Sequence, residues 1–304
     1  MISRTSPAGR STASSSSSRL SPALLGVTAV VAAAAVVGGV VLIGNDDSDA
    51  TTASGEPFGM AHVHGLGIDP QDGSLLAGTH YGAFRVDGDG SVEQVGPTQD
   101  FMGFTVAAAD RYLASGHPGA DQADAPPNLG LIESIDGGES WSSLSLLGEA
   151  DFHTLEARHD RVYGHAGGRL MVSQDKKTWD ERASIAIADL AVSPDDPDTV
   201  IATTEQGLAL TVDGGNTFSG VPNAPVMVLI TWTDEGVIVG VDPQGAVHVS
   251  GDRGNSWERR GTAGDQPAAL TATAEVVYVA TADGRIVEST DGGRTFDVRY
   301  QEAR

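Results

Sequence analysis

One short motif recurs five times along the chain at a nearly constant interval. The copies are SIDGGESW, SQDKKTW, TVDGGNTF, SGDRGNSW and STDGGRTF, which begin at Ser134, Ser173, Thr211, Ser250 and Ser289. The aromatic residues that close them are spaced 38, 39, 39 and 39 residues apart. A fixed period near 40 residues is typical of solenoids and β-propellers, in which each repeat is one supersecondary unit. We therefore expect a ring or stack of similar units.

The residues between the motifs predict short β-strands. The last unit contains four segments rich in β-branched residues, AALTATAE, VVYVATAD, RIVESTD and FDVRY. Their apolar residues alternate rather than following a period of 3.6, which argues against helical repeats. A divergent sixth copy, RVDGDGSV, ends 49 residues before the first closing aromatic residue, and an insertion at residues 117–128 accounts for the larger offset. Four strands in each of six units predict an all-β, six-bladed β-propeller over residues 57–304.

The motif itself is explained by turn formation. Its aspartate can accept hydrogen bonds from backbone N–H groups across a tight turn, and its glycines allow the positive φ that such a turn requires. The closing tryptophan or phenylalanine is expected to return into the core between blades. We therefore assign a structural role to the five motif aspartates, Asp136, Asp175, Asp213, Asp252 and Asp291.

The N-terminal segment differs in composition from the repeats. Residues 1–19 form a Ser-rich leader with three arginines and no acidic residue, and residues 20–44 contain no charge. At about 1.5 Å per residue, this apolar stretch is long enough to cross roughly 30 Å of bilayer hydrocarbon. The positive-inside bias predicts a single-pass cell-membrane protein with a cytoplasmic leader, a tether at residues 45–56 and an extracytoplasmic propeller. The alternative is a protein secreted after cleavage of a signal peptide.

The charge of the predicted propeller limits its partners. Three of the 18 lysines and arginines precede residue 44, which leaves 15 against 41 acidic residues beyond it. Such a surface repels polyanions, so no nucleic-acid partner is expected and anionic substrates are disfavoured. The chain has no cysteine, which excludes disulfides and thiolate metal sites. We expect a monomeric ectodomain that binds an unknown ligand or another envelope protein.

The motif S-x-D-x-G-x-[ST]-[WF] resembles the Asp-box, or BNR repeat, of sialidases and related β-propellers. The segments HVHGLGID, LLAGTH, DFMGFT, ASGHPG and LLGEADFHTL are similar to exported actinobacterial and firmicute proteins described as F510-type glycosylhydrolase-like. The resemblance implies a sialidase-like fold and raises glycosyl hydrolysis as an activity. The arginine triad, tyrosine nucleophile and Arg-Ile-Pro segment of sialidases have no recognisable counterpart here. No sialidase catalytic residue is therefore transferred to this chain.

Histidines are concentrated at one predicted end of the ring. Six of the eight occur where first strands begin or second strands end in the first three units, namely His62, His64, His80, His117, His153 and His165. Imidazoles near thioethers and carboxylates are ligands for zinc or copper, and methionine favours Cu(I). We predict a copper or zinc site drawn from His62, His64, His80, His117 and His153, with Met60 and Met102 as further candidates.

Two other interpretations stay open. A glycoside hydrolase would need a pair of carboxylates on the same face, for which the candidates are Asp100, Asp151, Glu149 and Glu205. A protein-interaction scaffold would use the broad face, and the insertion at residues 117–128 would be a lid or a surface loop. The histidines would then hydrogen-bond the backbone and help to close the ring. The sequence leaves enzyme activity undecided.

Overall fold

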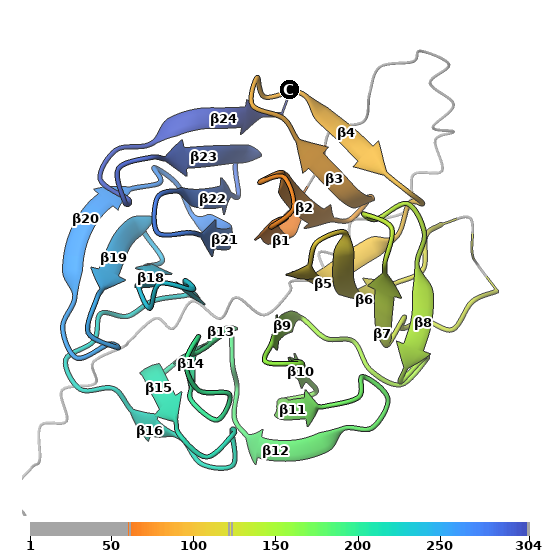
Figure 1. The fold of residues 1–304 in the computed structure, drawn as a ribbon, viewed down its shortest axis with the longest axis horizontal. Coiled ribbons are helices and arrows are strands. Elements are labelled where there is room, and N and C mark those ends of the chain that lie inside the picture. Colours follow the sequence, from red (N-terminus) through yellow and green to blue (C-terminus); the bar gives the residue numbers. More distant parts are fainter. Residues whose placement is uncertain (1–59, 61, 121, 123, 303–304) are drawn as a thin grey trace, which may run out of the picture. The chain divides into compact units, whose positions relative to one another are not determined.

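The computed structural model describes residues 60, 62–120, 122 and 124–302. Within these residues, six four-stranded sheets are arranged around a central axis (Figure 1). The prediction of an all-β, six-bladed β-propeller is confirmed. The predicted leader, membrane span and tether (residues 1–19, 20–44 and 45–56) lie outside the described residues. No helix in the described part of the chain is long and apolar enough to span a membrane.

Each blade is built from four consecutive strands. Blade 1 contains β1 (Val63–Ile68), β2 (Leu75–Thr79), β3 (Gly82–Val86) and β4 (Val92–Val95). Blade 2 contains β5 (Asp100–Ala108), β6 (Arg111–His117), β7 (Leu131–Ser134) and β8 (Ser142–Ser145). Blade 3 contains β9 (Thr154–Arg158), β10 (Arg161–Ala166), β11 (Arg169–Ser173) and β12 (Asp180–Ser184).

The remaining blades follow the same plan. Blade 4 contains β13 (Asp189–Val192), β14 (Val200–Thr204), β15 (Gly207–Thr211) and β16 (Ser219–Gly220). Blade 5 contains β17 (Leu229–Trp232), β18 (Ile238–Val241), β19 (Ala246–Ser250) and β20 (Glu258–Thr262). Blade 6 contains β21 (Pro267–Ala272), β22 (Val277–Thr281), β23 (Arg285–Ser289) and β24 (Asp297–Gln301).

Every blade is an antiparallel meander whose first strand lies innermost and whose fourth strand lies at the rim (Figure 1). The innermost strands contact one another in order around the axis, and β1 contacts β21 to complete the ring. Among the described residues, the first and last blades share no strand, so side-chain packing closes the ring. Met60, Leu66 and Phe84 pack with Tyr278 and Ile286 in one apolar cluster at this junction.

The repeated motifs form the turns between third and fourth strands, which we call the repeat turns. In blade 4, Asp213 Oδ1 accepts a hydrogen bond from the backbone N–H of Thr217 (2.9 Å), and Oδ2 accepts one from Thr217 Oγ1 (2.6 Å). Bonds from the Thr217 side chain and backbone lower the Asp213 pKa to about 2. The other four motif aspartates accept corresponding bonds, namely Asp136, Asp175, Asp252 and Asp291. Their contacts fit the structural role expected from the sequence.

The aromatic residues that close the motifs pack between blades. Trp141 packs in one apolar cluster with Leu76 and Ala83 of blade 1, and Trp179 packs in another with Leu113 and Leu131 of blade 2. Trp179 also donates a hydrogen bond from Nε1 to Ser145 Oγ of the preceding blade (2.9 Å). Each motif thus holds both its own turn and the contact to a neighbouring blade.

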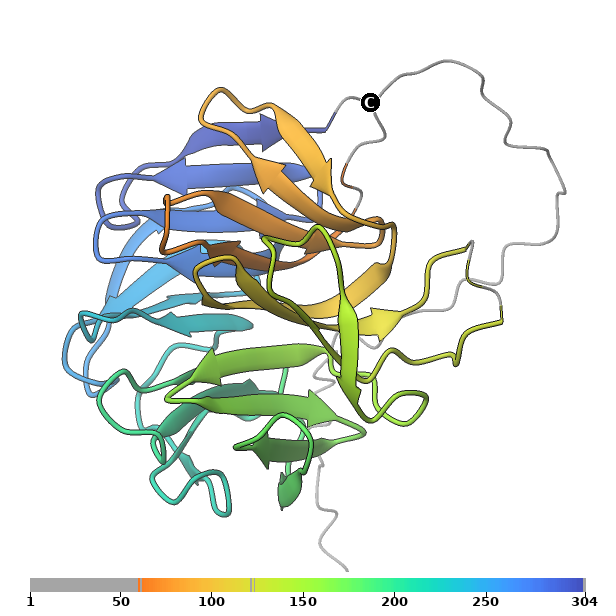
Figure 2. The same cartoon turned by 45° about the vertical axis from the view of Figure 1, so that its right-hand side comes forward.

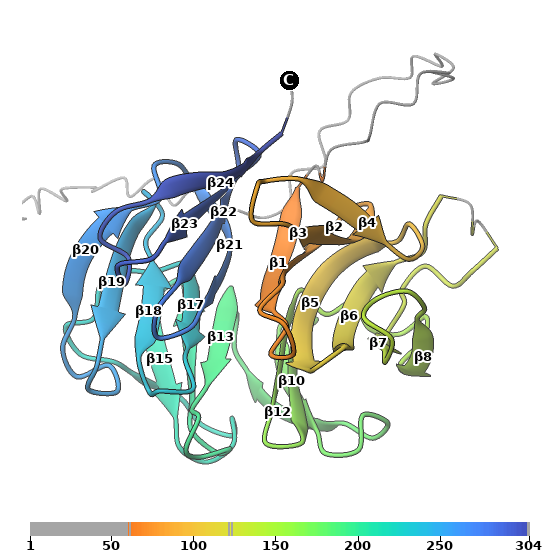
Figure 3. The ribbon, with the colours of Figure 1, turned by 45° about the horizontal axis from the view of Figure 1, so that its top comes forward.

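The two ends of the ring carry different loops (Figure 3). The N–H of Gly137 donates to the carbonyl of Asp110 (2.9 Å), so repeat turns share one end with the turns between first and second strands. The other end holds the starts of the innermost strands and the turns between second and third strands, and we call it the histidine end. The insertion between β6 and β7, yellow in Figure 2, projects outward from blade 2.

Candidate metal centre

A cavity of about 490 Å³ runs along the axis between the innermost strands. At the histidine end, one residue of each blade occupies an equivalent position. It directly follows a buried residue at the start of the innermost strand. In chain order these are His64, Met102, His153, Ala188, Val228 and Ala268, and all but Val228 line the cavity. The three blades that carry potential metal ligands are therefore adjacent. The other three present only small or aliphatic side chains at this level.

Four residues of blades 1 and 2 form a first cluster, His62, His64, His80 and Asp100. The Nε2 atoms of His64 and His80 lie 3.2 Å apart, and His80 Nδ1 lies 2.7 Å from Asp100 Oδ1. The ring of His62 is centred 5.8 Å from that of His80. In the described part of the chain, His64, His80 and Asp100 form the group of histidines and carboxylates whose ligand atoms all lie within 4.8 Å of one another.

A β-bulge presents His64 to His80. Val63 pairs with Thr79 and Gly65 pairs with Gly78, so His64 is an extra residue in β1 with no partner of its own. Bulges of this kind re-aim side chains at functional sites. The turn from β2 into β3 then carries His80 to the same end of the sheet.

Glycines let blade 2 pack closely against this part of blade 1. A Cβ atom at Gly78 would lie 2.5 Å from the Cβ of Phe104, and one at Gly65 would lie 2.9 Å from the same atom. Both contacts are too short for a side chain to be accommodated without a shift. The glycines of HVHGLGID and LLAGTH thus permit the approach of β5, whose first residue is Asp100.

The first cluster contains one imidazole, His64, that burial keeps neutral, and a second, His80, that a carboxylate orients. Burial, followed by the neighbouring His80, lowers the His64 pKa to about 4, so His64 is neutral at pH 7. A His80 Nδ1–H that donates to Asp100 leaves Nε2 of a neutral His80 as an acceptor. Carboxylates orient metal-binding histidines in this way. With Zn–N bonds of about 2.05 Å in tetrahedral geometry, two ligand nitrogens lie about 3.3 Å apart, which matches the observed separation.

A second cluster contains the other predicted ligands, His117 and His153, together with Asp151. His153 Nε2 lies 2.9 Å and His117 Nε2 lies 3.6 Å from Asp151 Oδ2. Burial acts to raise the Asp151 pKa, but the hydrogen bond from His153 and the charges of the two histidines lower it overall. The same hydrogen bond raises the His153 pKa. The five histidines from which the sequence predicts one metal site are thus divided between two clusters.

The two candidate methionines lie in different environments. Met102 is partly exposed and lines the cavity near His64 and His153. The side chain of Met60 is fully buried in the apolar cluster between the first and last blades. It is therefore not available at the cavity surface. The carboxylate candidates Glu149 and Glu205 are exposed residues outside both clusters.

The remaining histidines bond mainly to the backbone. His165 Nε2 lies 3.0 Å from the carbonyl oxygen of Ile185, and His159 Nε2 lies 2.8 Å from that of Ser193. His248 pairs with Asp242 in blade 5, with 3.2 Å between Nε2 and Oδ2. The contacts of His159 and His165 join blade 3 to later segments of the chain, whereas His64 and His80 have only side-chain partners among the described residues.

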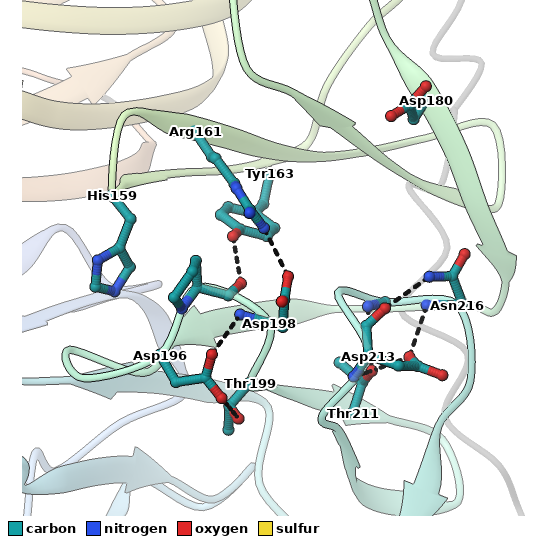
Figure 4. A network of polar contacts seen from close by, with 12 residues as sticks. His159, Arg161, Tyr163, Asp180, Asp196, Asp198, Thr199, Thr211, Asp213 and Asn216 are labelled. Carbon is teal, nitrogen blue, oxygen red and sulfur yellow. Dashed lines mark hydrogen bonds and ion pairs between the residues drawn. The ribbon is translucent and has the colours of Figure 1, made fainter.

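Tyr163 belongs to a network of polar contacts that joins blades 3 and 4 (Figure 4). Its ring is fully buried and its hydroxyl donates to the carbonyl of Pro197. Arg161 beside it forms an ion pair with Asp198 at 2.7 Å. A tyrosine held in this way has a structural role.

Two partly exposed carboxylates that line the cavity, Glu156 and Asp189, were not expected from the sequence. Burial raises the pKa values of Glu156 and Asp189 to about 7. Asp189 accepts hydrogen bonds from the backbone N–H groups of Leu190 (2.9 Å) and Ile230 (2.8 Å), which joins blade 4 to blade 5. In the sequence, each is an acidic residue within or at the start of an otherwise apolar strand. Only the closed propeller shows that both residues line the axial cavity.

Comparisons with known proteins support the fold and no finer assignment. No protein-family model and no curated protein sequence matches the chain. Solved β-propellers are similar in structure: a chain of a nidogen/laminin complex has a TM-score of 0.60 at 11% identity, covering 75% of this chain and 93% of that one. A gluconolactonase from Xanthomonas campestris has a TM-score of 0.58 at 12% identity, covering 73% of this chain and 84% of its own. An ancestral GH74 enzyme has a TM-score of 0.52 at 13% identity, covering 79% of this chain but 38% of its own.

Proposed function

We propose that this propeller is a metal-binding protein of the cell envelope, which holds a zinc or copper ion at the histidine end of its ring. His64 and His80 would be the ligands through Nε2, and Asp100 would orient His80. His62 would lie beside the site, with its ring centred 5.8 Å from that of His80. The observation that carries the proposal is the 3.2 Å separation of the two Nε2 atoms, one of them on an imidazole bound to a carboxylate.

A purely structural role accounts less well for this pair. Two neutral imidazoles can share one hydrogen bond, but such a bond satisfies no backbone group. His159 and His165 illustrate the structural use of histidine, since each bonds to a backbone carbonyl of another strand or loop. Asp100 binds the other nitrogen of His80 and so orients its ring. Histidines that bind metal are oriented in this way, whereas closure of the propeller needs no such contact.

The composition of the chain supports a place in the envelope. The uncharged stretch at residues 20–44 and the arginine-bearing leader before it favour a membrane anchor with the propeller outside the cytoplasm. The excess of acidic residues beyond residue 44 would raise the local concentration of cations. The five repeat turns support membership of the Asp-box class of propellers, which includes enzymes and binding proteins alike.

Metal analysis of the full chain tests the proposal. The protein is stripped with a chelator, incubated with zinc or copper, dialysed and analysed for bound metal. We expect His64→Ala/His80→Ala to lose one bound ion per chain. His165→Ala, which removes a histidine at the same end that bonds to the backbone, should lose none. Equal metal content in all three proteins would refute the proposal.

Hydrolysis of a neutral glycan is a second candidate function. The supporting observation is Glu156, a carboxylate in the axial cavity with a pKa raised to about 7, as general acids require. Asp189, with a similarly raised pKa, lies near enough to raise that of Glu156. Turnover of a neutral glycan by the wild type and its loss in Glu156→Gln would support an enzyme. A panel of glycans that all remain intact would exclude this role for Glu156.

A further inference from the structure

The axial cavity has room for a small organic molecule. Its volume of about 490 Å³ falls within the range of small-molecule pockets, about 300 to 1,000 Å³. In the described part of the chain, each innermost strand is the last strand on the axis side of its sheet, so its inner backbone edge borders this space (Figure 1). Leucines from four blades line it as well, namely Leu66, Leu155, Leu190 and Leu270. The cavity thus offers both polar groups and apolar surface to a ligand.

The charges around this cavity are mainly negative. Four acidic residues line it, namely Glu156, Asp189, Asp234 and Glu235. Arg158 is the one lysine or arginine among the described lining residues, and it forms an ion pair with Asp234. Neither Glu156 nor Asp189 forms an ion pair in the part of the chain that the structure describes. The cavity therefore favours a ligand with a positive charge.

Glu156 and Asp189 lie where a negative charge is poorly hydrated. Loss of hydration is the main cause that raises both pKa values to about 7. Arg158 acts to lower the pKa of Glu156, and the charge of Asp189 acts to raise it. Asp189 accepts hydrogen bonds from the backbone N–H groups of Leu190 and Ile230, but these only partly offset its loss of hydration. A cation beside the two carboxylates would stabilise their ionised forms.

A buried hydroxyl group at the cavity has no hydrogen-bond partner. Thr105 lines the cavity with 8% of its surface exposed, and its Oγ1 forms no hydrogen bond within the described structure. The seven other buried threonines of the described residues each form a side-chain hydrogen bond, namely Thr79, Thr154, Thr203, Thr204, Thr211, Thr233 and Thr281. Buried polar groups are normally hydrogen-bonded. The exception lies at the cavity, where a ligand can supply the partner.

An organic cation fits this cavity better than a metal ion does. Among the described residues, no three acidic residues of the cavity bring their ligand atoms close enough together to hold one ion. An alkylammonium group needs no such cluster, because it donates up to three hydrogen bonds to carboxylate, hydroxyl or carbonyl oxygens. Its carbon chain can contact the leucines of the walls, which a hydrated metal ion cannot use.

We propose that the axial cavity binds a small organic cation, an alkylamine or a diamine. The carboxylates of Glu156 and Asp189 hold its ammonium group, and Thr105 Oγ1 is a further hydrogen-bond acceptor. The site uses neither of the proposed metal ligands, His64 and His80, and does not depend on the proposed function. It differs from a glycan site in the charge of its ligand.

Isothermal titration of the full chain in detergent, stripped of metal with a chelator, tests this site. The probes are butylamine, 1,4-diaminobutane and spermidine, and 1,4-butanediol is an uncharged control. We expect at least one amine to bind at about 1 mM or below and the diol to show no binding. Glu156→Gln should weaken amine binding at least about tenfold. Glu205→Gln, which removes the same charge from an exposed residue outside the cavity, should leave it unchanged.

The pH dependence of binding gives a second measurement. Glu156 is faced by Arg158 on its own strand, by Asp189 on β13 and by Asp234 after β17, while His64 and His153 line the histidine end of the cavity. Because the pKa values of Glu156 and Asp189 are raised to about 7, the affinity for the amine should increase as pH rises through about 7. The increase should be smaller in Glu156→Gln, which shares every other titrating group with the wild type.

The outcomes separate this site from the metal site. His64→Ala/His80→Ala should bind the amine as the wild type does, whether or not it has lost a metal ion. If Glu156→Gln fails to fold, Thr105→Val removes the unpartnered hydroxyl and should weaken amine binding several-fold. Failure of all three amines to bind, diol binding as tight as amine binding, or equal amine affinity in wild type, Glu156→Gln and Thr105→Val would refute the proposal.

Discussion

Replacing Asp100 by asparagine should weaken metal binding at the first cluster about tenfold without unfolding the ring. The amide oxygen can still accept the His80 Nδ1–H bond, which is 2.7 Å long in the wild type, so the ring orientation is kept. The negative charge that makes His80 a stronger ligand is lost. A charge-assisted hydrogen bond is worth about 1.5 to 3 kcal/mol.

The size of this effect follows from the exposure of the pair. The side chains of His80 and Asp100 are 38% and 30% exposed, so solvent screens their interaction. We therefore expect a loss of binding free energy near the lower end of that range. About 1.4 kcal/mol corresponds to a tenfold increase in Kd. Asp100→Ala removes the orienting acceptor as well and should weaken binding by about 10- to 100-fold.

Isothermal titration of the metal-free protein with zinc measures both variants. Asp242→Asn is the matched control, because Asp242 pairs with His248 in blade 5, away from the first cluster. Its zinc affinity should equal that of the wild type. If Asp100→Asn and Asp100→Ala both bind zinc as tightly as Asp242→Asn does, Asp100 does not orient a metal ligand and the reasoning fails.

Three further predictions concern the scaffold. Gly78→Ala forces a Cβ to 2.5 Å from Phe104 and should cost about 1 to 3 kcal/mol in thermal unfolding, whereas Gly220→Ala, with open space around it, should cost much less. The Glu156 pKa is raised from 4.5 to about 7, so folding stability should fall as pH rises from about 4.5 to 7, by at most about 3 kcal/mol. Urea unfolding of Glu156→Gln should therefore show a flatter dependence of stability on pH than the wild type. An equal dependence in the two proteins would contradict this. The Asp213 pKa is lowered from 3.8 to about 2, so Asp213→Asn should be less stable than the wild type above pH 4, and the difference should shrink as pH falls through about 2. A difference that stays constant over that range would exclude the turn bonds as the cause.

The blade architecture could be predicted from sequence because its signals are local and repeated. Each repeat turn carries its own aspartate, glycine and aromatic residue, and a spacing of about 39 residues leaves room for four short strands. The concentration of histidines at strand starts and ends also follows from local pattern, since it needs only the order of strands within a blade.

The division of the histidines into two clusters could not be predicted in the same way. It depends on bulges at His64 and Met102 and on close packing of blade 2 against Gly65 and Gly78, which are set by contacts between blades. Met60 is a related case. It is close to His62 in sequence, yet its side chain packs in the apolar cluster between the first and last blades. These blades share no strand, so apolar side chains such as Met60 hold the junction together.

The position of the two carboxylates in the axial cavity could not be predicted for another reason. Glu156 lies in the segment TLEAR, where an acidic residue in an alternating strand normally indicates a solvent-facing position. The innermost strand of a propeller has no such face, since one side packs on a neighbouring blade and the other borders the axis. The enclosure of this residue within the axial cavity therefore follows from the closed ring and not from its sequence neighbours.

The most direct test of the metal-binding account is a crystal structure of the zinc-loaded protein, with anomalous differences recorded on both sides of the zinc absorption edge. The account predicts a zinc peak about 2.0 to 2.1 Å from Nε2 of both His64 and His80, with the His80–Asp100 hydrogen bond retained. A fully loaded crystal with no peak at these atoms, and with zinc only at histidines such as His248 or His159, would contradict it.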